Sequence, residues 1–512
     1  MKYSGEKNLF SLILKIVIVT VLVFLQLLVF IVIFNATKNF SLVVSSLFVL
    51  VELIAILYVV YRDLNPAYKI IWIILILSVP IFGIVLYFLA GSSKFPKRFK
   101  RLVNSVYKTT DKYLVRNDEV YSGLNLLSDD AYKQANYLWN TSSYPLYKND
   151  SAEYLPLGEI YYEKMCEDIK KAEKYIFIEY FIISRGKAWD RLVKLLKEKA
   201  KEGVKIYIST DGIGSVFKLP RGFKSLDQEK NIYINIFNPV TPIISFRLNN
   251  RNHRKITIID GKVAYTGGIN IGDEYINLIN KFGHWKDFGI RITGESVRSF
   301  VIMFVRTWNF GVKKMKITDD LFTSNLKRRN DGYIVPYSDG PINNNNPAEN
   351  TYMNMINSAK KYIYVTTPYL ILDNELQQAF INAARSGIDV RIIVPGIPDK
   401  KTVHACGKSF YGKLLSAGVK IYEYTPGFIH GKMCICDDVY GVIGSVNFDF
   451  RSLYLHYECA VWLYKAKAIF DMKEDYLKMI SVSKEVSLKE LNQRSIFRKM
   501  GSAILKIFAP LL

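Results

Sequence analysis

The sequence predicts an α/β protein whose soluble part contains two copies of one unit, placed after a group of N-terminal membrane helices. The observations behind this prediction are long apolar runs within residues 1–92, a repeated strand–helix–strand pattern, and a short His-x-Lys motif in each repeat. A chain of 512 residues has room for two or three folded units. Half of the residues are hydrophobic, which excludes disorder over most of the length.

The apolar runs come first in the chain. Residues 16–34 and 70–89 contain no charged side chain, and residues 40–60 contain only Glu52. Runs of this length can cross the hydrocarbon core of a bilayer as helices. We therefore expect residues 1–92 to form a membrane anchor of three transmembrane helices, the third kinked at Pro80. Two helices are the alternative, if the segment around Glu52 lies in the interface or is re-entrant.

A basic cluster follows the last apolar run and consists of Lys94, Lys97, Arg98, Lys100 and Arg101. By the positive-inside rule it predicts a multi-pass protein whose large C-terminal part faces the cytoplasm. The formal charge of +23 suits an anionic partner. The apolar runs favour anionic membrane lipid as that partner, and we expect no nucleic acid. Residues 93–137 are predicted to be a basic juxtamembrane linker.

The repeat occupies the following part of the chain. Residues 171–178 and 359–365 each indicate a helix end that leads into a strand. A helical stretch then ends at Gly203 in the first copy and at Gly387 in the second, and another buried-type strand follows. This order predicts parallel strand pairing within an α/β layer fold. The predicted boundaries are 138–325 for the first half, 326–349 for a linker and 350–482 for the second half.

Each half carries His-x-Lys, then four residues and Asp. The two sets are His253, Lys255 and Asp260, and His430, Lys432 and Asp437. Side chains alternate along a strand, so each His and Lys pair is expected on one face of its strand. Asp260-Gly261 predicts a tight hairpin turn. The return strands lead to Gly267-Gly268-Ile269-Asn270 and to Gly444-Ser445-Val446-Asn447.

This double motif resembles the phospholipase D superfamily over nearly all of the soluble length. Residues 253–275 and 444–452 are similar, within that superfamily, to the catalytic blocks of bacterial cardiolipin synthases, and 65–91 to their anchor. The resemblance implies two α/β/α sandwich halves around a pseudo-twofold axis, with one active site between them. It also implies a bacterial membrane enzyme that joins two phosphatidylglycerol molecules into cardiolipin and releases glycerol. His456 departs from the pattern, because asparagine is common at its position.

The residue types suit a phosphodiester substrate. Lys255 and Lys432 can neutralise its negative charge, and Asn270 and Asn447 can donate hydrogen bonds to it. Gly268 and Ser445 complete the predicted substrate-binding set. One histidine would attack phosphorus while the other moves the proton, so no metal or cofactor is expected.

The spacing does not decide which histidine attacks. The resemblance favours His253 as nucleophile and His430 as acid and base. It also implies that Asp287 and Glu458 bond the second ring nitrogens of the two histidines. Asp260 and Asp437 belong to the catalytic motif but are expected to be structural ion-pair partners. His284, His404 and His456 are expected to be structural.

Residues 483–512 predict an amphipathic C-terminal helix. Its apolar stripe contains Ile496, Phe497, Met500, Ala503, Ile504, Ile507 and Phe508, with basic residues around it. A membrane-interface helix and a helix packed on the catalytic part both fit this pattern.

Other functions share the same motifs. A membrane hydrolase, or a phosphatidyltransferase that uses another alcohol, would need the same catalytic residues. A nuclease is disfavoured by the apolar runs, and a scaffold by the two intact motifs. The five cysteines show no disulfide spacing and are expected to be reduced thiols.

Overall fold

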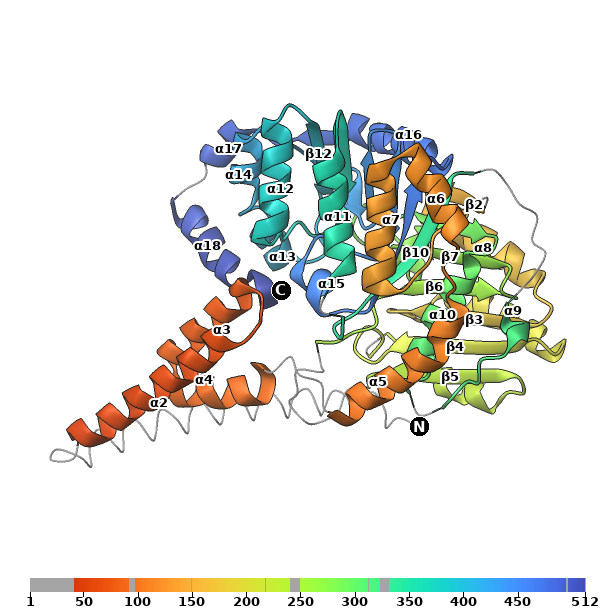
Figure 1. Cartoon of the computed structure of the whole chain (residues 1–512), viewed down its shortest axis with the longest axis horizontal. Coiled ribbons are helices and arrows are strands. Elements are labelled where there is room, and N and C mark those ends of the chain that lie inside the picture. Colours follow the sequence, from red (N-terminus) through yellow and green to blue (C-terminus); the bar gives the residue numbers. More distant parts are fainter. Residues whose placement is uncertain are drawn as a thin grey trace.

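A computed structural model describes residues 41–511 apart from 92–96, 149, 217, 240–248, 312, 323–330, 344 and 494–495. It contains two mixed sheets lying side by side, helices on their outer faces and a helical hairpin that projects from them (Figure 1). The predicted span 16–34 lies outside the described residues.

The first half is built on a seven-stranded sheet of order β2-β9-β7-β6-β3-β4-β5. Strands β3, β4 and β5 pair in parallel, as the strand–helix–strand pattern predicts, with α9 as a crossover helix. The bounds are β2 (Ser151–Leu155), β3 (Tyr175–Tyr180), α9 (Lys187–Lys201), β4 (Lys205–Asp211), β5 (Ile232–Phe237), β6 (Lys255–Ile259), β7 (Val263–Gly267) and β9 (Gly289–Thr293).

The second half repeats this arrangement in a nine-stranded sheet of order β1-β10-β17-β16-β15-β11-β12-β13-β18. From β10 to β13 each strand has a counterpart in the first half, and β11, β12 and β13 pair in parallel. The bounds are β1 (Tyr147–Lys148), β10 (Tyr333–Asp339), β11 (Tyr362–Thr366), α12 (Asn374–Arg385), β12 (Asp389–Pro395), β13 (Lys420–Tyr424), β15 (Lys432–Cys436), β16 (Tyr440–Gly444), β17 (Glu458–Tyr464) and β18 (Ser483–Glu485).

Helices cover both faces of each sheet and join the halves. In the first half α8 (Gly158–Lys170) and α9 cover one face, and α10 (Val297–Trp308) covers the other. Helix α10 also contacts β10, and its counterpart α16 (Ala468–Ser481) contacts β2. Every residue of α10 except Arg298 is buried, so this helix lies in a hydrophobic core shared by both halves. The predicted pair of α/β/α halves is confirmed.

Both predicted linkers contain ordered elements, which corrects the sequence-based boundaries. Strand β10 lies within residues 326–349 and pairs along its whole length with β17, so the second half begins at β10. Residues 93–137 contain α5 (Lys97–Thr110), α6 (Asp118–Leu127) and most of α7 (Asp129–Ser142). Helix α7 packs on β10 and on α11 (Pro347–Ser358). It also contacts β17, because Trp462 Nε1 of that strand donates to Gln134 Oε1 at 3.1 Å. The helices in these segments are amphipathic, and they bury their apolar faces although the segments also carry basic residues.

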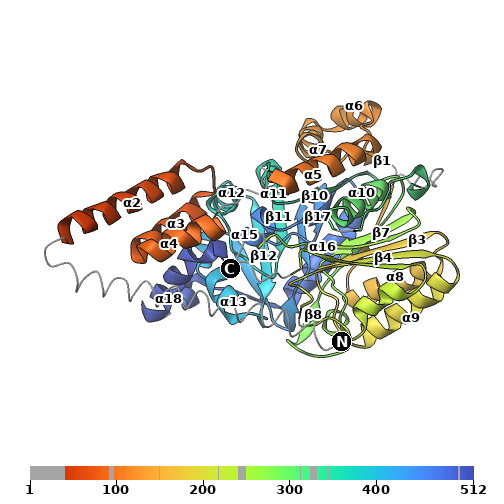
Figure 2. The same ribbon diagram turned by 90° about the horizontal axis from the view of Figure 1, so that it is seen from below.

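The N-terminal helices differ from the predicted spans. Helices α2 (Ser41–Tyr61), α3 (Pro66–Ser78) and α4 (Pro80–Leu86) form the projecting hairpin (Figure 2). None of the helices in the described part of the chain combines the length and apolar character that a membrane crossing needs. The run 70–89 is divided between α3 and α4 because Pro80 lacks an N–H and disfavours the helical conformation at Val79, which has φ −144° and ψ 75°. The prediction of continuous spans over 40–60 and 70–89 is therefore not supported.

The C-terminal residues form more than the single predicted helix. Strand β18 adds to the second sheet, and α17 (Leu488–Asn492) and α18 (Ile496–Ile507) follow it. Helix α18 lies against α3 and against α13 (Lys401–Gly407). Met500 and Ile504 nevertheless remain exposed, so this helix both packs on the protein and presents an apolar surface.

Candidate active site

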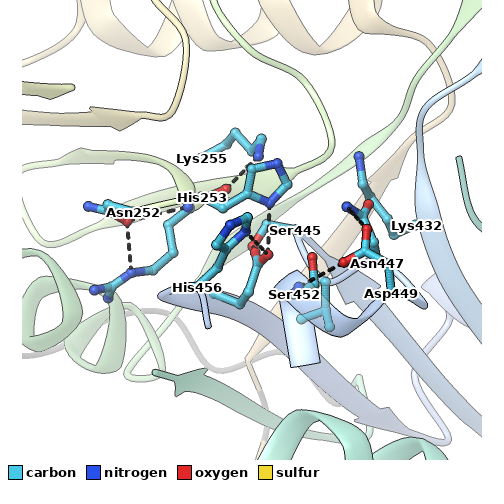
Figure 3. A network of polar contacts seen from close by, with 12 residues as sticks. Asn252, His253, Lys255, Lys432, Ser445, Asn447, Asp449, Ser452 and His456 are labelled. Atoms are coloured by element: carbon cyan, nitrogen blue, oxygen red, sulfur yellow. Dashed lines mark hydrogen bonds and ion pairs between the residues drawn. The ribbon is translucent and has the colours of Figure 1, made fainter. Parts of the chain in front are cut away.

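The two His-x-Lys motifs meet where the halves join. Lys255 and Lys432 are the first residues of β6 and β15 and are fully buried. His253 and His430 lie two residues earlier, just before these strands rather than on them as predicted, and each is 7% exposed. In Figure 3, His253 and Lys255 lie on one side of the site and Lys432 on the other.

Short parallel pairings between the halves fix the position of each histidine. Strand β8 (His284–Lys286) pairs with β14 (Gly427–Ile429), so the next residues, Asp287 and His430, lie side by side. A second parallel bridge joins Asn252 to Tyr457 and brings His253 beside Glu458. The backbone N–H of His253 donates to Tyr457 O at 2.9 Å, and that of His430 donates to Lys286 O at 2.8 Å.

Each histidine is paired with an acid from the other half. His253 Nδ1 lies 2.8 Å from Glu458 Oε1, and His430 Nδ1 lies 2.7 Å from Asp287 Oδ2. Both acids are fully buried, so they are not surface acids. Because a carboxylate only accepts hydrogen bonds, Nδ1 of each neutral ring carries the proton and Nε2 carries the lone pair, which on His430 faces Lys432 Nζ at 3.1 Å. The sequence identified the acids, but it did not show that they cross between the halves.

Burial lowers the pKa of all four basic groups of the site, His253, His430, Lys255 and Lys432. Burial lowers the pKa of His253 well below 6.5 against the effect of Glu458, and it lowers that of His430 to about 4, assisted by Lys432. Burial together with the neighbouring charge of Lys432 lowers the pKa of Lys255 to about 7, and burial lowers that of Lys432 to about 8. An anion bound here would stabilise the protonated forms of all four groups.

Gly268 and Ser445 occupy equivalent positions in the two halves, but they affect the neighbouring acids Asp287 and Glu458 in different ways. A Cβ on Gly268 would lie 2.2 Å from Asp287 Oδ1 and 3.0 Å from the carbonyl oxygen of His430. Glycine is therefore what allows Asp287 to reach His430. In the second half the Ser445 hydroxyl donates to Glu458 Oε2 and steadies that carboxylate. Gly268 thus makes room for Asp287 and Ser445 holds Glu458, while their predicted contact with substrate stays a prediction.

The two asparagines border the site through the strand-end loops. Asn270 Oδ1 accepts from the backbone N–H of Ile182 at 3.0 Å, and the Asn270 side chain also forms a hydrogen bond with Tyr275. Asn447 Nδ2 donates to Asp449 Oδ2 at 3.0 Å. Hydrogen bonds thus hold both side chains, and substrate contact by these amides stays a prediction.

Asp260 and Asp437 lie away from the histidines, at the far ends of β6 and β15. A five-residue strand separates them from the lysines by about 15 Å, at ~3.3 Å per residue. Asp260 accepts from the backbone N–H groups of Glu173, Lys174 and Tyr175, and Asp437 accepts from those of 360–362. The two acids therefore fasten a turn to the start of β3 and of β11. Backbone amides are thus partners of both acids, and their structural role stays a prediction.

His456 is a site residue that sequence reasoning missed. Its ring centroid lies 5.5 Å from that of His253, and its Nδ1 lies 3.8 Å from Glu458 Oε1. The available signal was its position two residues before Glu458, which places both side chains on one face of an extended segment. His284 instead contacts the Tyr424 hydroxyl at 3.0 Å, in keeping with a structural role.

Comparisons with known proteins agree with this geometry. Residues 165–280 and 352–480 match the family described as cardiolipin synthase, PLD-like domain, and residues 53–92 match the phospholipase D–nuclease N-terminal family. A cardiolipin synthase of Clostridium perfringens is 33% identical over 460 residues, which are 88% of this chain and 95% of that protein. The chain belongs to the cardiolipin synthase family. Cardiolipin synthase 1 of Staphylococcus aureus is 32% identical over 452 residues, covering 86% of this chain and 91% of that one.

A solved structure shows the same fold in a more distant protein. The phosphatidylserine synthase of Haemophilus influenzae superimposes on 74% of this chain and 97% of its own, with a TM-score of 0.57 and 16% identity. At that identity the similarity supports the two-half fold of this cardiolipin synthase family member and nothing about its substrate.

Proposed function

We infer that this chain is a cardiolipin synthase, which transfers a phosphatidyl group from one phosphatidylglycerol to another and releases glycerol. The observation that carries this inference is the pair of buried imidazole–carboxylate contacts between the halves, beside two buried lysines, in a chain of this family. An in-line exchange at a phosphodiester requires a free Nε2 on the attacking ring, a proton on the other ring and cationic groups beside the phosphate.

In the proposed first step, His253 Nε2 attacks phosphorus and the bond from phosphorus to the glycerol headgroup breaks. His430, protonated, gives its proton to the departing glycerol oxygen. The low pKa of His430 describes the empty site. A bound phosphodiester anion raises that pKa and supplies the imidazolium when it is needed.

In the second step the hydroxyl of another phosphatidylglycerol gives its proton to His430, and its oxygen attacks phosphorus. The bond from nitrogen to phosphorus breaks, which returns both histidines to their starting state. Lys255 and Lys432 stabilise the charge that gathers on the phosphoryl oxygens in both steps. Buried surroundings strengthen these interactions and keep water from taking the place of the alcohol.

Product analysis separates this function from its nearest alternatives. The purified chain with phosphatidylglycerol should release glycerol and cardiolipin in equal amounts. Phosphatidic acid as the main product would identify a hydrolase, and cardiolipin formed only with another donor or alcohol would identify a different transferase. His253→Ala and His430→Ala should each abolish the product, whereas His404→Ala on α13 serves as the matched control.

We also propose that α2–α4 and α18 attach the enzyme to the membrane. The hairpin exposes large apolar side chains, among them Leu47, Leu53, Leu57 and Leu77, and α18 adds Met500 and Ile504 beside it. Such a surface is unusual in a protein that contacts only water. Tyr68 of α3 packs on Phe450 and Tyr454 of the second half and would hold the catalytic part at the bilayer.

The multi-pass topology and the cytoplasmic position of the catalytic halves belong to this membrane proposal. They are supported by the apolar runs and the basic cluster of the sequence. All five native cysteines are buried, so a single introduced Cys can be labelled selectively. Val115→Cys, at a side chain that is 67% exposed, should react with an impermeant maleimide only after cells are opened. Labelling of intact cells would place the catalytic part outside.

A further inference from the structure

An unsatisfied histidine lies beside the reactive pair. His456 is 8% exposed, and neither of its ring nitrogens makes a hydrogen bond within the described residues. Its nearest charged neighbour is Glu458, with Nδ1 3.8 Å from Oε1, too far for a hydrogen bond. Burying such a group without a partner costs free energy, so its presence calls for a physical reason.

The equivalent place in the first half lacks this feature. There the residue two positions before the acid is Trp285, whose Nε1 donates to Asp287 Oδ2 at 3.3 Å. An indole N–H donates and cannot coordinate a metal ion. At this position the two halves therefore differ, because only the second half places an imidazole beside the carboxylate of its histidine–acid pair.

Together His253, His456 and Glu458 form a buried cluster whose possible ligand atoms all lie within 4.8 Å of one another. In Figure 3, His253 and His456 lie beside each other near Ser445. Zinc binds nitrogen at about 2.0–2.1 Å and carboxylate oxygen at about 2.0–2.2 Å, so two ligand atoms of a tetrahedral ion lie ~3.3 Å apart. The separations of 2.8 Å and 3.8 Å from Glu458 Oε1 lie on either side of that value.

We propose that His253, Glu458 and His456 form an inhibitory binding site for a divalent transition-metal ion such as Zn²⁺. The Glu458 carboxylate supplies negative charge, and its two oxygens are held by His253 Nδ1 and by the Ser445 hydroxyl. Lys255 carries an opposing charge toward the same pair. The site therefore suits a reversible regulator of modest affinity more than a permanently bound ion.

The mode of inhibition follows from the His253 imidazole, whose two nitrogens share one proton. The metal takes the place of the proton between His253 Nδ1 and Glu458, and that proton moves to Nε2, so the ring stays neutral with one proton. A protonated Nε2 has no lone pair and cannot attack phosphorus. This step rests on the proposed role of His253, whereas metal binding itself does not.

The test begins with metal binding in the absence of turnover. The full chain in detergent, stripped with a chelator, is titrated with Co²⁺ while its visible absorption is followed, and Zn²⁺ is then added as competitor. One ion per chain in a four- or five-coordinate spectrum is expected. His456→Asn, which carries the residue common in the family, should weaken binding about 10-fold or more. His404→Asn, the same change outside the cluster, should bind as the parent does.

Inhibition is measured separately, with each variant compared with its own metal-free rate of cardiolipin formation. The Zn²⁺ concentration for half-inhibition should rise about 10-fold or more in His456→Asn and stay unchanged in His404→Asn. Absence of binding by the parent chain, or equal affinity in His456→Asn, would overturn the proposal. If thermal unfolding shows that His456→Asn does not fold, Glu458→Gln replaces it in the binding titration, where loss of Co²⁺ binding is expected. Because metal binding is measured without substrate, its result does not depend on whether the chain is a cardiolipin synthase.

Discussion

At the residue scale, Gly268 illustrates how little room the site has. An added methyl group would collide with Asp287 Oδ1, which lies 2.2 Å from the place of the missing Cβ. We expect Gly268→Ala to displace Asp287 from His430 and to lower kcat about 10-fold to 100-fold, as loss of a supporting hydrogen bond does. Cardiolipin formation at saturating substrate measures the effect. Gly412→Ala on α14 (Tyr411–Ser416) is the control, because nothing lies within 4 Å of its Cβ. Equal rates for the two variants would contradict the prediction.

The lysines set the dependence of the reaction on pH. Burial lowers the pKa of Lys255 to about 7 and that of Lys432 to about 8, so the free enzyme loses these charges as pH rises through that interval. We expect kcat/KM, which reports ionisations of the free enzyme, to fall with increasing pH above the pKa of His430 and to fall more steeply between about 7 and 8, where the lysines lose their protons. A bound phosphodiester raises these pKa values, so kcat should fall only at higher pH. A kcat/KM whose slope against pH does not steepen by pH 9 would show that the lysines remain charged in the free enzyme.

At the element scale, the motif aspartates act on turns and strands. Asp260 and Asp437 occupy left-handed turn positions, at φ 53° and 56°, and each receives three backbone N–H groups. Asp260 is 2% exposed, so Asp260→Asn weakens charge-assisted hydrogen bonds of a buried carboxylate and should lower the free energy of unfolding by about 1–3 kcal/mol. Asp437→Asn should cost less, because Asp437 is half-buried whereas Asp260 is buried.

Denaturant unfolding measures both changes, and the rate of cardiolipin formation by the folded protein should stay close to that of the parent chain. A large fall in kcat without a fall in stability would indicate that these aspartates take part in catalysis. The distinction is physical, since each lies a whole strand away from its histidine.

At the scale of the whole molecule, the exchange of acids makes each catalytic pair a product of both halves. In the proposed mechanism Glu458 supports the nucleophile His253, and Asp287 supports the proton donor His430. Glu458→Gln and Asp287→Asn should each lower kcat about 10²-fold to 10⁴-fold with phosphatidylglycerol, since the wrong ring tautomer becomes available.

A phosphatidyl ester of p-nitrophenol distinguishes the two acids, because this leaving group departs without a proton. Asp287→Asn should then retain a burst of p-nitrophenol, and Glu458→Gln should lose it. The reverse pattern would make His430 the nucleophile. Peptide mapping of the trapped phosphatidyl adduct provides an independent check of the same assignment.

The sequence by itself determined the features that repeat along the chain. Period-two alternation, helix-ending glycines and the two His-x-Lys motifs predicted parallel α/β halves and the histidines and lysines that meet between them. These features are local, so a short stretch of residues encodes each one. The apolar runs were also evident, and so was the break at Pro80, which divides the run 70–89 between α3 and α4.

Only the tertiary structure decided which residues of one half act on the other. His253 and Glu458 are 205 positions apart, and His430 and Asp287 are 143 apart, so no local period relates them. The same is true of β10, whose partner β17 lies far along the chain, and of His456, which becomes a neighbour of His253 only through the Asn252–Tyr457 bridge. Contacts of this kind depend on the packing of two sheets into one core, which places residues by shape and burial and leaves no periodic pattern in the sequence.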